Sequence, residues 1–98
     1  YARSVVRHYS GRGYGVQRIR QELYRRGIPR EFWEDAMEER SDPEERITAF
    51  LNQKMRGHEN DPKQLKRAAD ALLRRGFRWE EIRTGLNRYG ANIEEESL

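Results

Sequence analysis

The basic residues of this chain gather in two segments that could bind negatively charged groups. Residues 1–27 hold seven Arg and one Glu, and residues 62–79 hold six Lys or Arg and one Asp. Because the whole chain carries a formal net charge of only +3, the rest of it is acidic. An Arg guanidinium can bind a phosphate or a carboxylate through two parallel hydrogen bonds. The two segments therefore predict contact with a phosphate backbone or with an acidic protein surface.

Helical periodicity indicates which basic side chains point away from a core. With 3.6 residues per turn, Val16, Ile19 and Leu23 share one face of a helix, and the opposite face carries Arg18 and Arg25. The candidate partner-binding or DNA-binding residues are Arg7, Arg12, Tyr14, Arg18, Arg25, Lys63, Lys66, Arg67 and Arg74. The alternative is that these charges only keep an exposed helix face soluble. Acidic residues are largely absent from both basic segments, which favours a binding role over one in solubility alone.

Tyr14 stands between two glycines, and two interpretations of it remain open. Its ring could stack on a nucleic-acid base or fill a pocket of a partner. It could equally pack across the first two helices. Trp33 and Trp79 fall on apolar stripes, so we expect both of them in the core.

Residue types suited to catalysis or metal binding are sparse. The chain has no Cys, and its two His, His8 and His58, stand without carboxylates at a metal-ligand spacing. No Ser/His/Asp set and no pair of catalytic carboxylates is recognisable. The glycine-rich residues 11–15 follow a helix, whereas a dinucleotide-binding loop follows a strand. We therefore expect no enzyme, no metal site and no cofactor.

Apolar periodicity predicts three helices within the first 40 residues. The first carries apolar residues at helical spacing up to Tyr9 and ends at the glycines of positions 11, 13 and 15. The second runs from about Tyr14 to Arg26, and Gly27 ends it, because the residue after a helix often needs a positive φ. The third begins near Pro29, and its apolar stripe consists of Phe32, Trp33, Ala36 and Met37.

Three more helices are predicted between residues 41 and 90. Asp42 and Asp61 each precede a proline, which is the pattern of an N-cap followed by the first helical residue. The fourth helix has the apolar stripe Ile47, Phe50, Leu51 and Met55. The fifth helix, which Gly76 ends, has the stripe Leu65, Ala68, Ala69, Leu72 and Leu73, and the sixth has Trp79, Ile82, Leu86 and Tyr89. Residues 91–98 are expected to form a frayed acidic tail.

The two halves of the chain are related by a repeat with an offset of 49 residues. At this offset Arg18, Leu23, Arg25, Arg26, Gly27 and Glu31 are identical to Arg67, Leu72, Arg74, Arg75, Gly76 and Glu80. We therefore expect an all-α fold of six helices in two tandem three-helix repeats, residues 1–40 and 41–90. Such repeats stack and present one extended surface.

Several short motifs resemble those of a known family. Gly13-Tyr14-Gly15, followed by residues 18–23 and by Arg26-Gly27-Ile28, resembles the middle repeat of the RecX family, the bacterial regulators of the RecA recombinase. Asp61-Pro62-Lys63, with residues 72–77 and Glu81-Ile82, is similar to the final repeat of that family. The family usually carries three repeats, and this chain resembles the second and third. Val16 differs from the proline that commonly follows the glycine motif.

The resemblance implies an elongated, curved molecule that regulates RecA without being an enzyme. Members of the family bind RecA filaments on single-stranded DNA and inhibit ATP hydrolysis, strand exchange and filament growth, and so modulate recombination, DNA repair and the SOS response. The arginine stripes would then contact the acidic surface of the filament or its DNA. The residues alone do not separate these two contacts.

Two other functions are compatible with the sequence. One is a helical nucleic-acid-binding module with weak, non-specific affinity for single-stranded or double-stranded DNA and no recombinase partner, although its third and sixth helices are too acidic for major-groove reading. The other is a scaffold whose charges only provide solubility.

No apolar run is long enough to span a membrane and no leader opens the chain, so we expect a soluble, cytoplasmic monomer.

Overall fold

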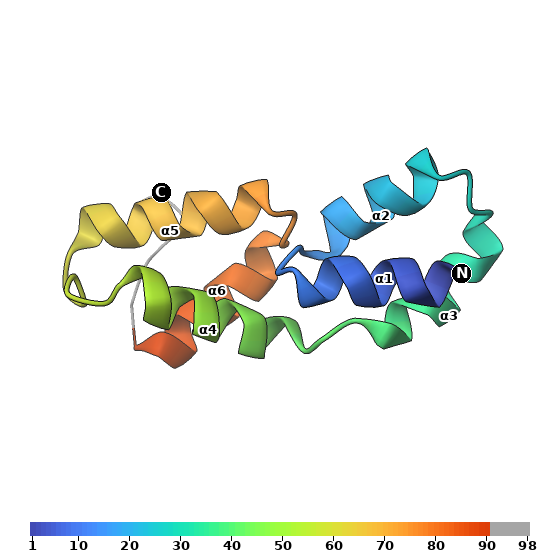
Figure 1. Cartoon of the computed structure of the whole chain (residues 1–98). Coiled ribbons are helices and arrows are strands. Elements are labelled where there is room, and N and C mark those ends of the chain that lie inside the picture. The colour runs from blue at the N-terminus through green and yellow to red at the C-terminus, as the bar shows by residue number, and fades with distance from the viewer. Residues whose placement is uncertain (91–98) are drawn as a thin grey trace.

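The computed structural model describes residues 1–90, and every regular element in that range is helical. The elements are α1 (Ala2–Gly11), α2 (Val16–Arg25), α3 (Trp33–Ala36), α4 (Pro43–Lys54), α5 (Pro62–Arg74) and α6 (Trp79–Tyr89) (Figure 1). This confirms the all-α fold with six helices. The expected acidic tail, residues 91–98, lies outside the described residues. Between residues 1 and 90, no helix is long and apolar enough to cross a membrane.

The first three helices enclose a small core of their own. Val6, Ile19 and Leu23 are fully buried there, and Trp33 and Ala36 close the cluster from α3. The Trp33 indole N–H donates to the backbone carbonyl of Ile28 at 2.8 Å, so its polar atom is paired inside the core. The predicted inward face of α2 and the buried position of Trp33 are therefore confirmed.

The prediction of one continuous third helix was wrong. A 3₁₀ turn at Arg30–Phe32 precedes the four-residue α3, and a second 3₁₀ turn at Met37–Glu39 follows it. A 3₁₀ turn has three residues per turn, so it rotates side chains off the face that a 3.6-residue period predicts. As a result Phe32, expected on the inner stripe, is 52% exposed.

The last three helices form a second core around α4 and α6. Ile47 and Leu51 of α4, together with Met55 at its C-terminal cap, are fully buried against Ile82 and Leu86 of α6. Both predicted caps are confirmed, since the Asp42 side chain accepts from the N–H of Glu44 and that of Asp61 accepts from the N–H of Lys63. On α5 the buried side chains are Leu65, Ala68, Ala69 and Leu72. Leu73, predicted with them, is instead 45% exposed, because Leu72 and Ala69 already fill the inner face.

The two cores lie one after the other, so the described molecule is elongated. Its extents along the three principal axes are 43, 23 and 18 Å. In Figure 1, α5 and α2 follow one long edge, and α4 and α3 lie on the opposite edge. The contacts between the two halves determine which side chains lie along each edge.

Candidate interaction surface

The junction between the two halves is made by the first turn of α2 and the turn that follows α5. The backbone N–H of Gly15 donates to the carbonyl of Arg75 at 2.8 Å, and the N–H of Gln17 donates to the carbonyl of Gly76 at 2.9 Å. The first N–H groups of a helix have no partner within the helix itself. The second half of the chain thus caps the helix that carries the first basic stripe.

Two glycines make this approach possible. A Cβ on Gly15 would lie 2.3 Å from the backbone nitrogen of Phe77, and one on Gly76 would lie 2.5 Å from the backbone nitrogen of Arg18. Gly76 also has a φ of +98°, a conformation that glycine adopts without strain. Neither position has room for a side chain, so both glycines are required for the two helices to meet in this way.

Polar contacts on the other side of the junction join the same two halves. Arg40 and Glu81 form an ion pair at 3.0 Å in which both side chains are largely buried. The N–H of Ser41 donates to the buried hydroxyl of Ser10 at 2.7 Å. These contacts hold the second half in place from the side of α4 and α6.

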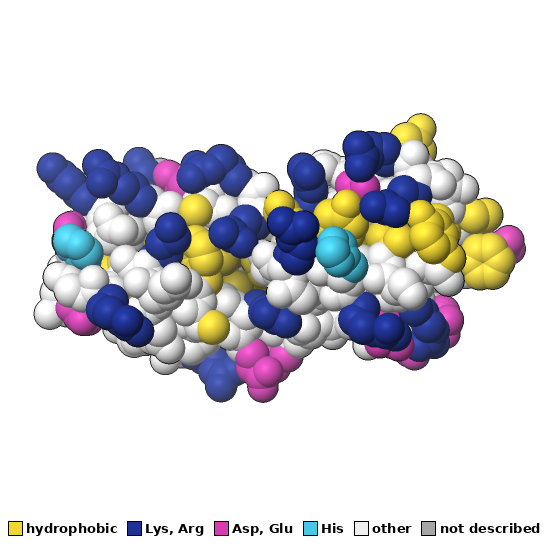
Figure 2. Space-filling view, viewed as in Figure 1, with side chains coloured by type: hydrophobic (Ala, Val, Ile, Leu, Met, Phe, Trp, Pro, Cys, Tyr) yellow, Lys and Arg dark blue, Asp and Glu magenta, His cyan; other side chains and the backbone are white. Residues whose placement is uncertain are grey.

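The junction places the two basic helices along one edge of the molecule. Figure 2 shows Lys and Arg side chains along the upper edge, over α5 and α2, with few acidic groups among them. The lower edge, over α3 and α4, mixes basic with acidic groups. We call the basic face of α2 and α5 the upper basic surface, which consists of Arg18, Arg25, Lys63, Lys66, Arg67 and Arg74.

In the α5 part of the upper basic surface, the cations have no carboxylate partner among residues 1–90. Lys63, Lys66, Arg67 and Arg74 are all exposed, and the structure of residues 1–90 records no ion pair for any of them. Arg67 and Arg74 line a hollow of about 190 Å³, and Lys54 of α4 completes its rim. Lys54 could not be predicted from the clustering of basic residues, because it lies in a segment that is acidic overall. Three cations around one hollow suit a phosphate or a carboxylate.

The α2 part of the surface is more constrained. Arg25 is 75% exposed but donates to the buried Glu22 carboxylate at 2.7 Å. This hydrogen bond, helped by others from Tyr9 and Arg26, holds the pKa of Glu22 below its ordinary value. Arg25 therefore has one acceptor already and would share its remaining donors with a partner.

Arg18 of α2 forms a cation–π pair with Tyr14, which lies in the turn before that helix. The Arg18 guanidinium lies 5.4 Å from the centroid of the Tyr14 ring. That ring is half-buried and packs against the first core, with its centroid 5.8 Å from that of Tyr9. The structure thus shows Tyr14 packing across the first two helices, and contact of its ring with a partner or a base stays a prediction. Tyr14 holds Arg18 at the surface.

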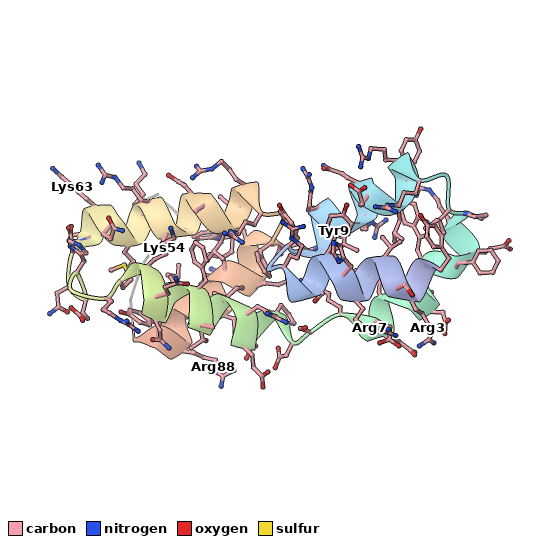
Figure 3. All side chains as sticks on the ribbon, viewed as in Figure 1. Arg3, Arg7, Tyr9, Lys54, Lys63 and Arg88 are labelled. Carbon is pink, nitrogen blue, oxygen red and sulfur yellow. The ribbon has the colours of Figure 1, made fainter. Side chains whose placement is uncertain are left out.

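The remaining candidates lie elsewhere. Arg7 lies 3.4 Å from the carboxylate of Glu39, which belongs to the 3₁₀ turn after α3. Figure 3 shows Arg7 beside Arg3, on the edge opposite to Lys63. Arg7 is therefore not part of the upper basic surface. Arg12 is exposed in the turn between α1 and α2, and its backbone N–H closes α1 on the carbonyl of His8. Within residues 1–90, no group of three or more His, Asp or Glu is arranged to hold a metal ion.

Two models of three-helix protein domains match the chain. Residues 1–37 match the family model described as RecX, second three-helix domain, and residues 42–86 match RecX, third three-helix domain. The chain belongs to the RecX family. The resemblance inferred from the short motifs is thereby confirmed, and with it the tandem three-helix architecture.

One curated relative is Regulatory protein RecX of Pseudomonas putida strain GB-1. It is 38% identical to this chain over 79 residues, which cover 79% of the chain and 51% of the relative. The chain thus spans about half the length of this RecX protein. No solved structure matches the chain.

Proposed function

We propose that this chain binds RecA filaments on single-stranded DNA through the upper basic surface and inhibits RecA ATP hydrolysis, strand exchange and filament growth. Membership of the RecX family supports RecA as the partner, and the matched relative is named a regulatory protein. The observation that carries the proposal is the end-to-end junction of α2 and α5. Through that junction two basic helix faces form one edge of the molecule.

A filament suits this surface because it presents the same groups again at every subunit. Arg18 and Arg25 of α2 are repeated at an offset of 49 residues by Arg67 and Arg74 of α5. Two equivalent stripes on one rigid edge let the second contact form at a high effective concentration once the first has formed. A partner with one compact binding site would contact only one of the two basic stripes.

The proposal assigns the chain no catalytic role. Its described residues present a charged edge with shallow hollows, and the hollow of Arg67 and Arg74 is lined by cations and by Ala68 and Ala71. Such a site can neutralise carboxylates or phosphates but supplies no nucleophile or proton acceptor. The chain would act by binding to the filament and not by catalysing a reaction.

The second candidate is direct binding to the DNA backbone without RecA. Between residues 1 and 90 the structure records no ion pair for the α5 cations, which favours this candidate, since such Lys and Arg side chains can displace counterions from phosphates. Binding to bare DNA would weaken steeply with salt and would not require RecA. Measuring affinity for bare single-stranded DNA, free RecA and RecA filaments at two salt concentrations separates the two candidates.

The experiment that tests the proposal compares two pairs of neutralising substitutions. Arg67→Gln with Arg74→Gln removes two cations from the upper basic surface, and Arg7→Gln with Arg88→Gln removes two from the opposite edge (Figure 3). The control pair breaks only the exposed ion pairs with Glu39 and Glu44, which contribute little to stability.

We expect the first pair to raise the concentration needed for half-inhibition of RecA ATPase by about tenfold or more, with the control near wild type. Equal inhibition by both variants and the wild type would contradict the proposal. Loss of affinity for bare DNA, together with no binding of the wild type to RecA filaments, would favour the second candidate.

A further inference from the structure

A second polar and aromatic face lies on α2, around the helix from the upper basic surface. Gln17, Arg20, Gln21 and Tyr24 follow the spacing i, i+3, i+4 and i+7, so they share one side of the helix. All four residues are exposed, and Tyr24 is 72% exposed. This side of α2 therefore presents an aromatic ring, a cation and two amides to solvent.

Two hollows adjoin this face, between α2 and the segment that leads into α3. They have volumes of about 320 and 250 Å³, and Arg20, Arg30 and Trp33 line both of them. The two glutamines and Tyr24 complete the smaller hollow, and Glu34 lines the larger one. Because three residues are common to both hollows, they form one shallow groove, which we call the α2–α3 groove.

Trp33 is the buried member of this groove and orients its two arginines. The guanidinium carbon of Arg20 lies 5.5 Å from the centroid of the Trp33 ring, and that of Arg30 lies 5.1 Å from it. The hydrogen bond from the Trp33 indole N–H to the carbonyl of Ile28 fixes the ring beneath them. A guanidinium on an aromatic face keeps its N–H donors available at its edge.

The two arginines of the groove carry no recorded ion pair within residues 1–90. Both are exposed, and the carboxylate of Glu34 pairs with neither of them. Arg20 and Arg30 are therefore available to a bound anion.

The repeat does not account for the groove. At the offset of 49 residues, the positions of Arg20, Tyr24, Arg30 and Trp33 correspond to Ala69, Leu73, Trp79 and Ile82. The second half thus keeps an apolar residue at the buried position but has neither arginine, and it has no aromatic ring in place of Tyr24. Packing of a three-helix unit does not require these side chains, so a binding role explains them better.

We propose that the α2–α3 groove binds unpaired bases of single-stranded nucleic acid. The exposed ring of Tyr24 would stack on a base, and Arg20 and Arg30 would bind the neighbouring phosphates. An acidic side chain of a protein supplies a charge alone, whereas each nucleotide supplies a ring and a phosphate together. Bases inside a duplex are covered on both faces by their neighbours, so the groove should select single strands.

This inference goes beyond the proposed function and does not rest on it. The upper basic surface would neutralise acidic groups, which needs no contact with bases, and the groove lies on another side of α2. Its test uses bare oligonucleotides without RecA, so either proposal can fail while the other stands.

Base contact is tested with two oligonucleotides of equal length and charge, oligo(dT) and an abasic strand that keeps the sugars and phosphates. Fluorescence anisotropy should show that the wild-type chain binds oligo(dT) at least about tenfold more tightly than the abasic strand. A duplex of the same length should bind no better than the abasic strand. Equal affinity for the two single strands, tighter binding of the duplex, or no measurable binding of oligo(dT) would overturn the proposal.

Tyr24→Leu places the residue of the equivalent position, Leu73, at the stacking site. Since Tyr24 is largely exposed, the variant should fold as the wild type does, which circular dichroism verifies. It should lose the preference for oligo(dT) and bind both strands alike. Phe32→Leu is the matched control, because it removes an exposed ring that lines neither hollow of the groove, and it should keep the preference. Equal behaviour of the two variants would show that bases do not stack on Tyr24.

Phosphate contact is tested by the salt dependence of oligo(dT) binding. Arg20→Gln with Arg30→Gln should reduce the slope of log affinity against log salt concentration by about 1.4, the value for two phosphates of a single strand. Arg7→Gln with Arg88→Gln removes two cations away from the groove and should leave the slope unchanged. The same slope for both double variants would contradict the assignment of phosphates to Arg20 and Arg30.

Discussion

Adding one methyl group at Gly15 should separate the two halves of the molecule. The backbone angles of Gly15, φ −88° and ψ 179°, are open to alanine, so Gly15→Ala acts through space alone. Its Cβ would lie 2.3 Å from the nitrogen of Phe77, a distance that requires the two backbones to move apart. That movement weakens the hydrogen bonds that Gly15 and Gln17 donate to Arg75 and Gly76.

The expected cost is large relative to the stability of a small domain. An unsatisfied buried N–H costs about 1–3 kcal/mol, so losing both bonds should cost about 2–6 kcal/mol. A chain of this length typically has about 5–15 kcal/mol in total. For a domain of this size the melting temperature falls by about 4–8 °C per kcal/mol, which gives a decrease of at least about 8 °C.

Gly11→Ala is the matched control, since Gly11 ends α1 without a positive φ and a Cβ there would meet no heavy atom within 4 Å. Alanine is favoured over glycine in a helix by about 0.5–1 kcal/mol, so this variant should melt at or slightly above the wild-type temperature. Circular dichroism melts and urea titrations of the three proteins give the comparison. If Gly15→Ala melted as Gly11→Ala does, the close junction of α2 with the turn after α5 would be wrong.

Two further substitutions test the interior. Because hydrogen bonding from Arg25 lowers the pKa of Glu22 below 4.5, its ionised form contributes stability above that pH and loses it as the pH falls through the folded-state pKa. Urea titrations at pH 7, 5 and 3.5 should therefore show a smaller loss of stability for Glu22→Gln than for wild type, and an equal loss would refute this. Gly85→Ala places a Cβ 2.3 Å from Cγ2 of Ile47 between α4 and α6. Overpacking should outweigh the helix-propensity gain and give a net destabilisation of about 1 kcal/mol in the same titration, whereas an increase in stability would contradict the packing.

Local signals in the sequence were enough to predict most of the fold. The inner face of α2 follows directly from the spacing of Val16, Ile19 and Leu23, all of which are buried. The caps at Asp42 and Asp61 depend on residues next to each other in the chain and were predicted for the same reason. Helix periodicity and capping are local properties, which is why a single sequence reveals them.

Contacts between distant residues could not be predicted in the same way. Gly15 was assigned as part of a helix stop, and its role as the contact point for Gly76 depends on the 60 intervening residues folding first. The same applies to Arg7, which is charged like its neighbours but pairs with Glu39 across the fold. Arg25 was expected on the outer face of α2, and its hydrogen bond to the buried Glu22 was not anticipated.

The most direct test of the central claim reverses one charge on each helix of the upper basic surface. Arg18→Glu with Arg67→Glu changes repeat-related positions of α2 and α5, and Arg7→Glu with Arg88→Glu makes the same net change on the opposite edge. The measurement is the concentration of each variant that half-inhibits RecA ATPase, with circular dichroism to verify equal helix content. We predict an increase of about tenfold or more for the first variant and little change for the second. Unchanged inhibition by the Arg18 and Arg67 variant would contradict the account.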